Sequence, residues 1–247
     1  MNRSQSKSRL ISGRIKIIVY WFLGIIQSVN VVAQVDLTIP QVHPRVFITP
    51  ADIPILQDKK NDPEFQSLWS SIVYHSNTHF LSAALIYLVD GNVTKGNWAV
   101  SQALTALQNK PSTNDAINKS SNIMNRAACV YDWCYDLLSE TQKTNFITEF
   151  ERLADTEAPG YPADYTPYSV IVGHIAESNV QLSQLLAGCA IHDEDSTMWD
   201  AAFALHWDKF IPARNQLYQM HMYWQGDSYF GRFINDSYNA WFYRKLG

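Results

Sequence analysis

The sequence has 247 residues, which is enough for one large domain or two small ones with a sizeable core. Charged residues make up 17% of the chain, aromatic residues 13%, and the net charge is −4. This negative net charge argues against a nucleic-acid-binding protein, which would carry an excess of basic residues. The three cysteines, Cys129, Cys134 and Cys189, have neither the number nor the spacing of a disulfide framework or a zinc site. We expect them to be small core hydrophobes, and we expect no metal or other cofactor.

Residues 1–33 have the pattern of a secretory signal peptide. Basic residues between Arg3 and Lys16 precede an apolar run over 17–26, and Val31-Val32-Ala33-Gln34 offers a cleavage point. The apolar run is too short to span a bilayer comfortably. We expect cleavage after Ala33 and a periplasmic or secreted mature protein without stable membrane insertion, a retained anchor being the alternative.

Beyond the leader, apolar residues recur with helical periodicity, which predicts a mainly α-helical protein. Thr49 is the expected cap of a first helix that has Pro50 at its first position and runs to about Lys60. Further helices are expected over 64–75, 79–89, 95–107, 116–138 and 140–156. The helix over 64–75 carries an apolar stripe for burial. Asp90-Gly91-Asn92 is expected to stop the helix over 79–89, and Ser139 to cap the helix over 140–156.

Residues 158–168 contain three prolines and three tyrosines, so we expect a loop there. Helices follow over 173–190, 197–218 and 235–246, with a polar turn at 192–195 and a break near Pro212. No segment alternates with the period of a strand. Successive helical hairpins of this kind fit an α-solenoid or an α/α toroid.

Three residues in the second half form a possible proton-transfer group. His174 and Glu177 are three residues apart, so they share one face of the expected helix. Tyr229 lies between Gly226 and Gly231, which favours a turn that presents its phenol. An imidazole, a carboxyl group and a phenol are all used in general acid–base catalysis.

The spacing of these residues, 177 − 174 = 3 and 229 − 174 = 55, resembles that of the catalytic residues of the heparinase II/III-like polysaccharide lyases, a group that includes related alginate lyases. The segment 43–49, His-Pro-Arg-Val-Phe-Ile-Thr, is similar to the entry motif of that family. The segment 128–139, which contains Tyr131-Asp132-Trp133, is similar to its helix-ending motif. The resemblance therefore runs from His43 to the C-terminus.

This resemblance implies an α/α toroid that cleaves uronic-acid-containing anionic polysaccharides by β-elimination. Tyr229 would transfer the proton on the leaving-group side, since a phenol with a reference pKa of about 10 donates readily at neutral pH. His174 would orient the uronate carboxylate or act as the base. Glu177 would hold His174 in one tautomer or share a hydrogen bond with the substrate carboxylate.

Other residues of the same region are candidate substrate contacts. Arg232 suits two-pronged recognition of a carboxylate, and aromatic rings suit stacking on sugars. The candidates are Asn179, Arg232, Trp224, Tyr165 and Tyr168, with His221 as a second imidazole. Trp133 is another aromatic candidate, for which a place in the core is the stronger expectation.

The chain departs from the family at its end. In the family the toroid continues, and a β-sandwich domain follows that contributes another catalytic histidine. Here the sequence stops at Gly247 while still in helical pattern. We therefore expect residues 34–247 to be the N-terminal part of a toroid, without its C-terminal part and the β-sandwich, and with apolar helix faces left exposed.

Two alternatives remain open at this point. An inverting glycoside hydrolase on a similar toroid needs two carboxyl groups roughly 6.5–9.5 Å apart. Asp132, Asp136, Glu177 and Asp227 could supply them. The second alternative is a fragment whose aromatic residues bind a glycan without cleaving it.

Overall fold

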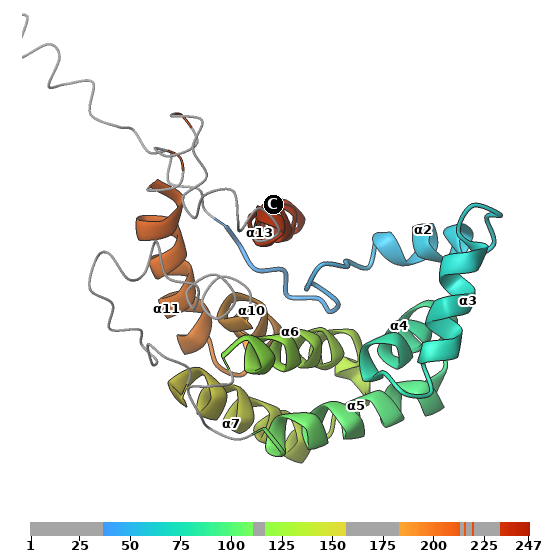
Figure 1. The fold of residues 1–247 in the computed structure, drawn as a ribbon. Coiled ribbons are helices and arrows are strands. Elements are labelled where there is room, and N and C mark those ends of the chain that lie inside the picture. The colour runs from blue at the N-terminus through green and yellow to red at the C-terminus, as the bar shows by residue number, and fades with distance from the viewer. Residues whose placement is uncertain (1–36, 111–116, 157–182, 213–214, 216–218, 220–232) are drawn as a thin grey trace, which may run out of the picture. The chain divides into compact units, whose positions relative to one another are not determined.

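The computed structural model describes residues 37–110, 117–156, 183–212, 215, 219 and 233–247 (Figure 1). The chain divides into two units after Asp36, and every described residue belongs to the unit Leu37–Gly247. The described residues are mainly helical and contain no strand, in agreement with the sequence. None of the described helices combines the length and the apolar character that crossing a membrane requires.

The helices follow one another with short connections wherever the chain is described. They are α2 (Asp52–Lys59), α3 (Gln66–His75), α4 (Phe80–Asp90), α5 (Val93–Gln108), α6 (Ile117–Trp133), the 3₁₀ turn η2 (Tyr135–Leu137), α7 (Glu140–Thr156), α10 (Leu185–Ile191), α11 (Thr197–Leu205), the π-helical turn η4 (His206–Phe210) and α13 (Phe233–Leu246).

Local signals in the sequence set several helix boundaries as predicted. Gly91 ends α4 in the left-handed conformation with φ 69°, which a residue without Cβ adopts at little cost. Asn92 then caps α5, because its side-chain oxygen accepts the N–H of Lys95, so α5 begins at Val93, two residues before the predicted start. Ser139 and Gln142 exchange side-chain and backbone hydrogen bonds at the start of α7, which is a capping box.

Other boundaries differ from the prediction. The α2 helix begins at Asp52 and not at Pro50. The Asp52 carboxylate accepts the N–H and the hydroxyl of Thr49, which ties the turn before the helix to its first residue. The α6 helix ends at Trp133 and not at Leu138, and a 3₁₀ turn covers most of the remainder. Near Pro212 the helix continues, and the turn before this proline widens into η4. A widened turn accommodates a residue that cannot donate its backbone hydrogen bond.

The helices of the unit Leu37–Gly247 pack in two layers. In one layer α4 contacts α6, and α6 contacts α10. In the other layer α5 contacts α7, and α5 also contacts both α4 and α6 (Figure 1). Small residues allow the helix backbones to approach closely. Buried alanines lie on each of the four helices α4, α5, α6 and α10: Ala83, Ala84, Ala99, Ala103, Ala127, Ala128, Ala187 and Ala190. The core therefore lies both between consecutive helices, such as α4 and α5, and between helices further apart in the sequence, such as α6 and α10.

The α13 helix closes this unit against its first segment. Phe47 stacks on Trp241 with ring centroids 5.5 Å apart, and it meets the edge of Phe242 at 5.9 Å. Lys245 Nζ lies 2.6 Å from a carboxylate oxygen of Asp52. Residues from the two ends of Leu37–Gly247 are thus direct neighbours (Figure 1).

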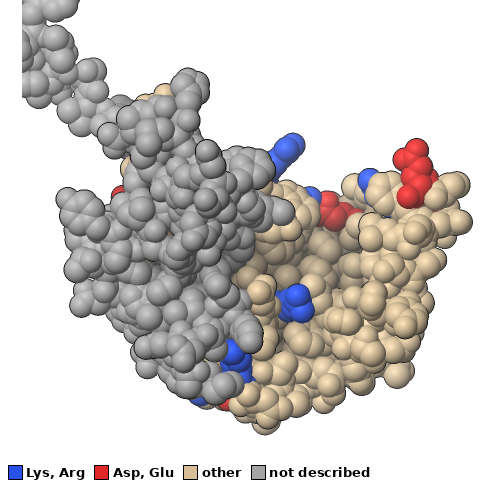
Figure 2. Space-filling model, in the orientation of Figure 1, with Lys and Arg blue, Asp and Glu red and all other residues tan. Residues whose placement is uncertain are grey.

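The apolar stripe expected over 64–75 is only partly covered. Trp69 and Ile72 are half-buried on the side where α3 contacts α4, whereas Leu68 and Val73 are 58% and 46% exposed. The α4 helix therefore covers one edge of the stripe. Charged side chains are also sparse on the described part of the face in Figure 2, which fits the low charged fraction of the sequence.

Candidate functional site

The residues that the sequence singled out for catalysis and substrate binding lie outside the described part of the chain. They are His174, Glu177, Tyr229, Asn179, Arg232, Trp224, Tyr165, Tyr168 and His221. Of the helix expected over 173–190, the structure describes the residues from Ser183 onward. The convergence of the imidazole, the acid and the phenol therefore stays a prediction.

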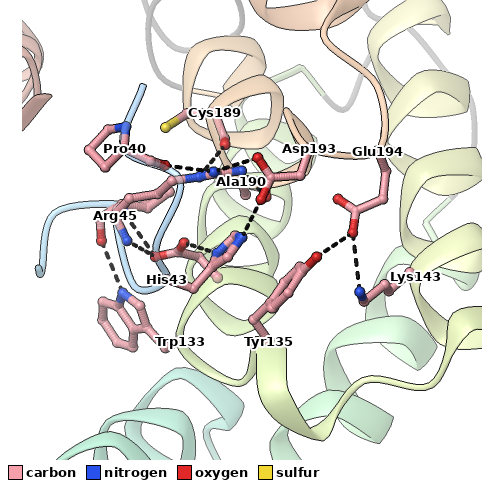
Figure 3. Close-up of polar contacts among 12 residues, drawn as sticks. Pro40, His43, Arg45, Trp133, Tyr135, Lys143, Cys189, Ala190, Asp193 and Glu194 are labelled. Atoms are coloured by element: carbon pink, nitrogen blue, oxygen red, sulfur yellow. Dashed lines mark hydrogen bonds and ion pairs between the residues drawn. The ribbon is translucent and has the colours of Figure 1, made fainter. Parts of the chain in front are cut away.

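The two family-like motifs that are described bind each other. The buried Asp132 carboxylate accepts the backbone N–H groups of Arg45 and Val46, each at 2.8 Å (Figure 3). Its other oxygen lies 2.7 Å from His43 Nδ1. Trp133 Nε1 donates to the Val46 carbonyl at 2.9 Å, and Trp133 is only 9% exposed, so it belongs to the core as expected.

Arg45 extends this contact to α10. Its guanidinium is fully buried and donates to the carbonyls of Pro40, Cys189 and Ala190 (Figure 3). Two of these acceptors are among the last carbonyls of α10, at the negative end of the helix dipole. Arg45 Nη1 also lies 2.9 Å from Asp193 Oδ1. We call His43, Arg45, Asp132 and Asp193 the entry clamp.

The entry clamp is a structural element. Partial burial acts to raise the pKa of Asp193, but hydrogen bonds and charge from Arg45 and His43 outweigh it and hold the pKa below its ordinary value. The Asp132 side chain has no exposed surface, and both of its oxygens are occupied. Asp132 and Asp136 both line a cavity of about 260 Å³, but Asp132 is buried and fully hydrogen-bonded, which suits a structural role better than that of a catalytic acid, whereas Asp136 is exposed.

A second polar group lies next to the entry clamp. The Tyr135 ring stacks on His43 with centroids 3.7 Å apart, and its hydroxyl donates to Glu194 at 2.7 Å (Figure 3). Lys143 Nζ lies 3.2 Å from the same Glu194 oxygen. Partial burial lowers the pKa of Lys143, but its contacts with Tyr135 and Glu194 outweigh that effect and raise the pKa above its ordinary value. These charges are satisfied internally, so this group also stabilises the fold.

Phe47, in the entry segment, has a strained backbone conformation. Its φ is 62°, which is uncommon for a residue with a side chain, and the N–H of Ile48 donates to the Val46 carbonyl across it. The three residues form a γ-turn of the rare type with positive φ. Such strain persists where surrounding contacts enforce it, often beside a functional site. Here the turn directs Phe47 towards α13.

Phe47 forms part of the wall of a cavity of about 400 Å³, which we call the aromatic cavity. Its other aromatic side chains are Trp133, Tyr238 and Trp241. Asn122, Asn125 and Arg126 of α6 provide its polar groups, at the helical spacing that places them on one face. Asn125 Oδ1 is buried without a hydrogen-bond partner among the described residues. The aromatic cavity thus combines flat apolar surfaces with amide and guanidinium groups.

Arg126 and Leu81 also line a second cavity, of about 390 Å³, which we call the basic pocket. Its described lining includes His75, His79, three hydroxyl side chains and no carboxylate. The imidazole rings of His75 and His79 lie 5.1 Å apart and almost perpendicular. Neither cavity was predicted from the sequence. The sequence does show the four-residue spacing of His75 and His79 and the polar residues on one face of α6.

Metal binding has no candidate among the described residues, because no three of their histidine, cysteine, aspartate or glutamate side chains cluster suitably. The three cysteines are buried and free, as expected. Comparison of the sequence with protein-family models and with curated proteins finds no match.

Proposed function

We propose that this chain is a polysaccharide lyase, or the N-terminal part of one, that cleaves uronic-acid-containing glycans by β-elimination. The observation that carries the proposal is the aromatic cavity, where four aromatic side chains face a guanidinium and two amides. Aromatic faces stack on the apolar faces of sugar rings. A guanidinium binds the carboxylate of a uronate through paired hydrogen bonds.

The two helical layers support an α/α toroid as the fold of this lyase. In that arrangement α4, α6 and α10 are inner helices, and α5, α7 and α11 are outer ones. The contacts of α4 with α6 and of α6 with α10 agree with it, as does the contact of α5 with α7. An extracytoplasmic location after removal of the leader belongs to the same proposal.

Chain connectivity supports a catalytic role for the predicted residues. Leu186, near the start of α10, lines the aromatic cavity. His174 and Glu177 precede Leu185 by 11 and 8 residues (185 − 174 and 185 − 177). Tyr229 precedes Phe233, the first residue of α13, by four residues, which limits the distance between their Cα atoms to about 14 Å. The proposed catalytic group thus belongs to segments that enter helices bordering this cavity.

In the proposed reaction the enzyme neutralises the uronate carboxylate, removes the C5 proton and protonates the leaving oxygen at C4. Tyr229 moves the proton on the leaving-group side. His174, oriented by Glu177, binds the carboxylate or removes the C5 proton. Asn179, Arg232, Trp224, Tyr165 and Tyr168 hold the sugar chain.

The test is the ultraviolet absorbance of the unsaturated product, measured with the full-length gene product on heparan sulfate, alginate and unsulfated glucuronate polymers. We expect Tyr229→Phe to lower the rate by about 10²-fold or more, since a general acid contributes 10²- to 10⁴-fold. Tyr74→Phe, at an exposed tyrosine of α3, is the matched control. Absence of unsaturated product from every polymer would overturn the proposal, and saturated reducing ends would indicate a hydrolase.

A further inference from the structure

The basic pocket has the composition of an oxyanion site. Its basic side chains come from three places: His75 at the end of α3, His79 just before α4, and Arg126 on α6. Among the residues that the structure describes, no acidic side chain pairs with any of the three. Three cationic or ionisable donors without a counter-charge favour an anionic ligand.

The arrangement of donors favours a tetrahedral group over a planar one. Ser71, Thr78 and Ser82 add hydroxyl groups to the lining of the pocket. The two imidazole planes meet at 87°, so their nitrogen atoms do not lie in one common plane, and Nδ1 of His79 lies 3.0 Å from the Thr78 hydroxyl. A planar carboxylate accepts hydrogen bonds within one plane, whereas a sulfate or phosphate monoester presents three terminal oxygens in three directions. Donors that converge from three elements therefore match the tetrahedral group better.

The neighbouring cavity indicates what carries this group. Arg126 and Leu81 line both the basic pocket and the aromatic cavity, so the two spaces share a wall. A sugar stacked on the aromatic side chains would thus lie within reach of Arg126. A free inorganic ion would have no use for the aromatic wall.

We propose that the basic pocket binds a tetrahedral oxyanion ester, a sulfate or phosphate group on the glycan, while the aromatic cavity holds the sugar ring next to it. This inference rests on the proposed function for the identity of the ligand as a glycan. It goes further in assigning specificity for a substituent to His75, His79 and Arg126.

Calorimetry at constant ionic strength tests this specificity. The titrants are a sulfated glucuronate oligosaccharide, its desulfated counterpart, a phosphorylated one and inorganic sulfate. The Tyr229→Phe background slows turnover during the measurement. We expect the sulfated or the phosphorylated ligand to bind at least tenfold more tightly than the desulfated one, and the tighter of the two identifies the ester. Equal affinity for all three oligosaccharides would overturn the inference.

Variants locate the site. Arg126→Gln and the pair His75→Asn with His79→Asn each remove charge-assisted hydrogen bonds, and we expect each to weaken binding of the ester ligand about tenfold or more. For the histidine pair, binding of the desulfated ligand should change less than threefold. Arg126→Gln should weaken that binding as well, because Arg126 also lines the aromatic cavity, where the uronate carboxylate is proposed to bind. Arg244→Gln and His192→Asn are controls at residues outside both cavities. All the replaced side chains except that of His192 belong to exposed residues, so folding should be retained, and circular dichroism checks this.

The two proposals fail in different ways. Ester-dependent binding without any unsaturated product would support the proposed role of the basic pocket and contradict the lyase proposal. Cleavage of unsulfated polymers, with no preference for an ester and no effect of the pair His75→Asn with His79→Asn beyond that of His192→Asn, would support the lyase and contradict the proposed role of the basic pocket.

Discussion

Arg45 and Asp193 form an ion pair, with Nη1 and Oδ1 2.9 Å apart, in which the arginine side chain has no exposed surface. The pair joins the first described segment of the chain to the turn after α10. Since Arg45 also donates to three carbonyl oxygens, this one side chain fixes the position of the entry segment.

Replacing the arginine of this pair should destabilise the protein strongly. Arg45→Met fills similar space but removes the guanidinium donor from the carbonyls of Cys189 and Ala190 and leaves Asp193 with His43 as its described partner. We expect the free energy of unfolding to fall by about 3 kcal/mol, as is typical when one partner of a buried pair is removed. Urea denaturation measures this, with Arg244→Met at an exposed position as a control that should stay within about 0.5 kcal/mol. A loss below 1 kcal/mol for Arg45→Met would contradict the structural role of the entry clamp.

The same pair predicts a dependence of stability on pH. The pKa of Asp193 in the folded state lies below its ordinary value of 3.8, so its carboxylate stabilises the fold fully above about pH 4. This contribution is lost as the pH falls through the folded-state pKa. Asp193→Asn should therefore be less stable than the parent at pH 6, and the difference should shrink at pH 3. Unfolding curves at both pH values measure it, and a difference that grows on acidification would contradict the assignment.

Gly188 marks the closest approach of α10 and α11. A Cβ at this position would lie 2.5 Å from the backbone nitrogen of Trp199 and 2.7 Å from its Cα, so one helix would have to move. We expect Gly188→Ala to lower the midpoint of thermal unfolding and to cost about 3 kcal/mol, near the upper end for overpacking. At Gly91 an added Cβ meets nothing, and only the positive φ opposes it. Gly91→Ala should therefore cost about 1 kcal/mol, and equal losses at both glycines would contradict this account.

The three cysteines should be unreactive in the folded protein. Burial, with the nearby charge of Asp132, raises the pKa of Cys134 to about 12, and burial likewise raises the pKa of Cys129 and Cys189. Reaction with a thiol needs the thiolate and access to it. Titration with a disulfide reagent should detect almost no thiol at pH 8 in the native protein and all three in denaturant. Rapid labelling of the native protein would contradict the burial of these residues.

The parts of the fold that the sequence predicts well depend on local interactions. Gly91 ends α4 because of its own backbone freedom, and the box of Ser139 and Gln142 is complete within four residues. The end of α6 was missed because a partner far away in the sequence decides it. Asp132 and Trp133 bind Arg45 and Val46, almost ninety residues earlier, and no local signal records that contact.

The candidate site shows the same division. The sequence placed His174 and Glu177 on one helical face through spacing alone, and whether they reach Tyr229 depends on contacts that spacing does not report. The basic pocket was missed because His75, His79 and Arg126 come together through the packing of α3, α4 and α6. The partly covered stripe of α3 is the reverse case, in which periodicity gave a face without saying what lies against it.

The stacking of Phe47 on Trp241 also bears on how the protein is made. These residues are 194 positions apart (241 − 47), and both line the aromatic cavity. A nascent chain can therefore not complete this wall until residue 241 has left the ribosome. Ligand recognition through the aromatic cavity would begin only after nearly the whole of this sequence has been translated.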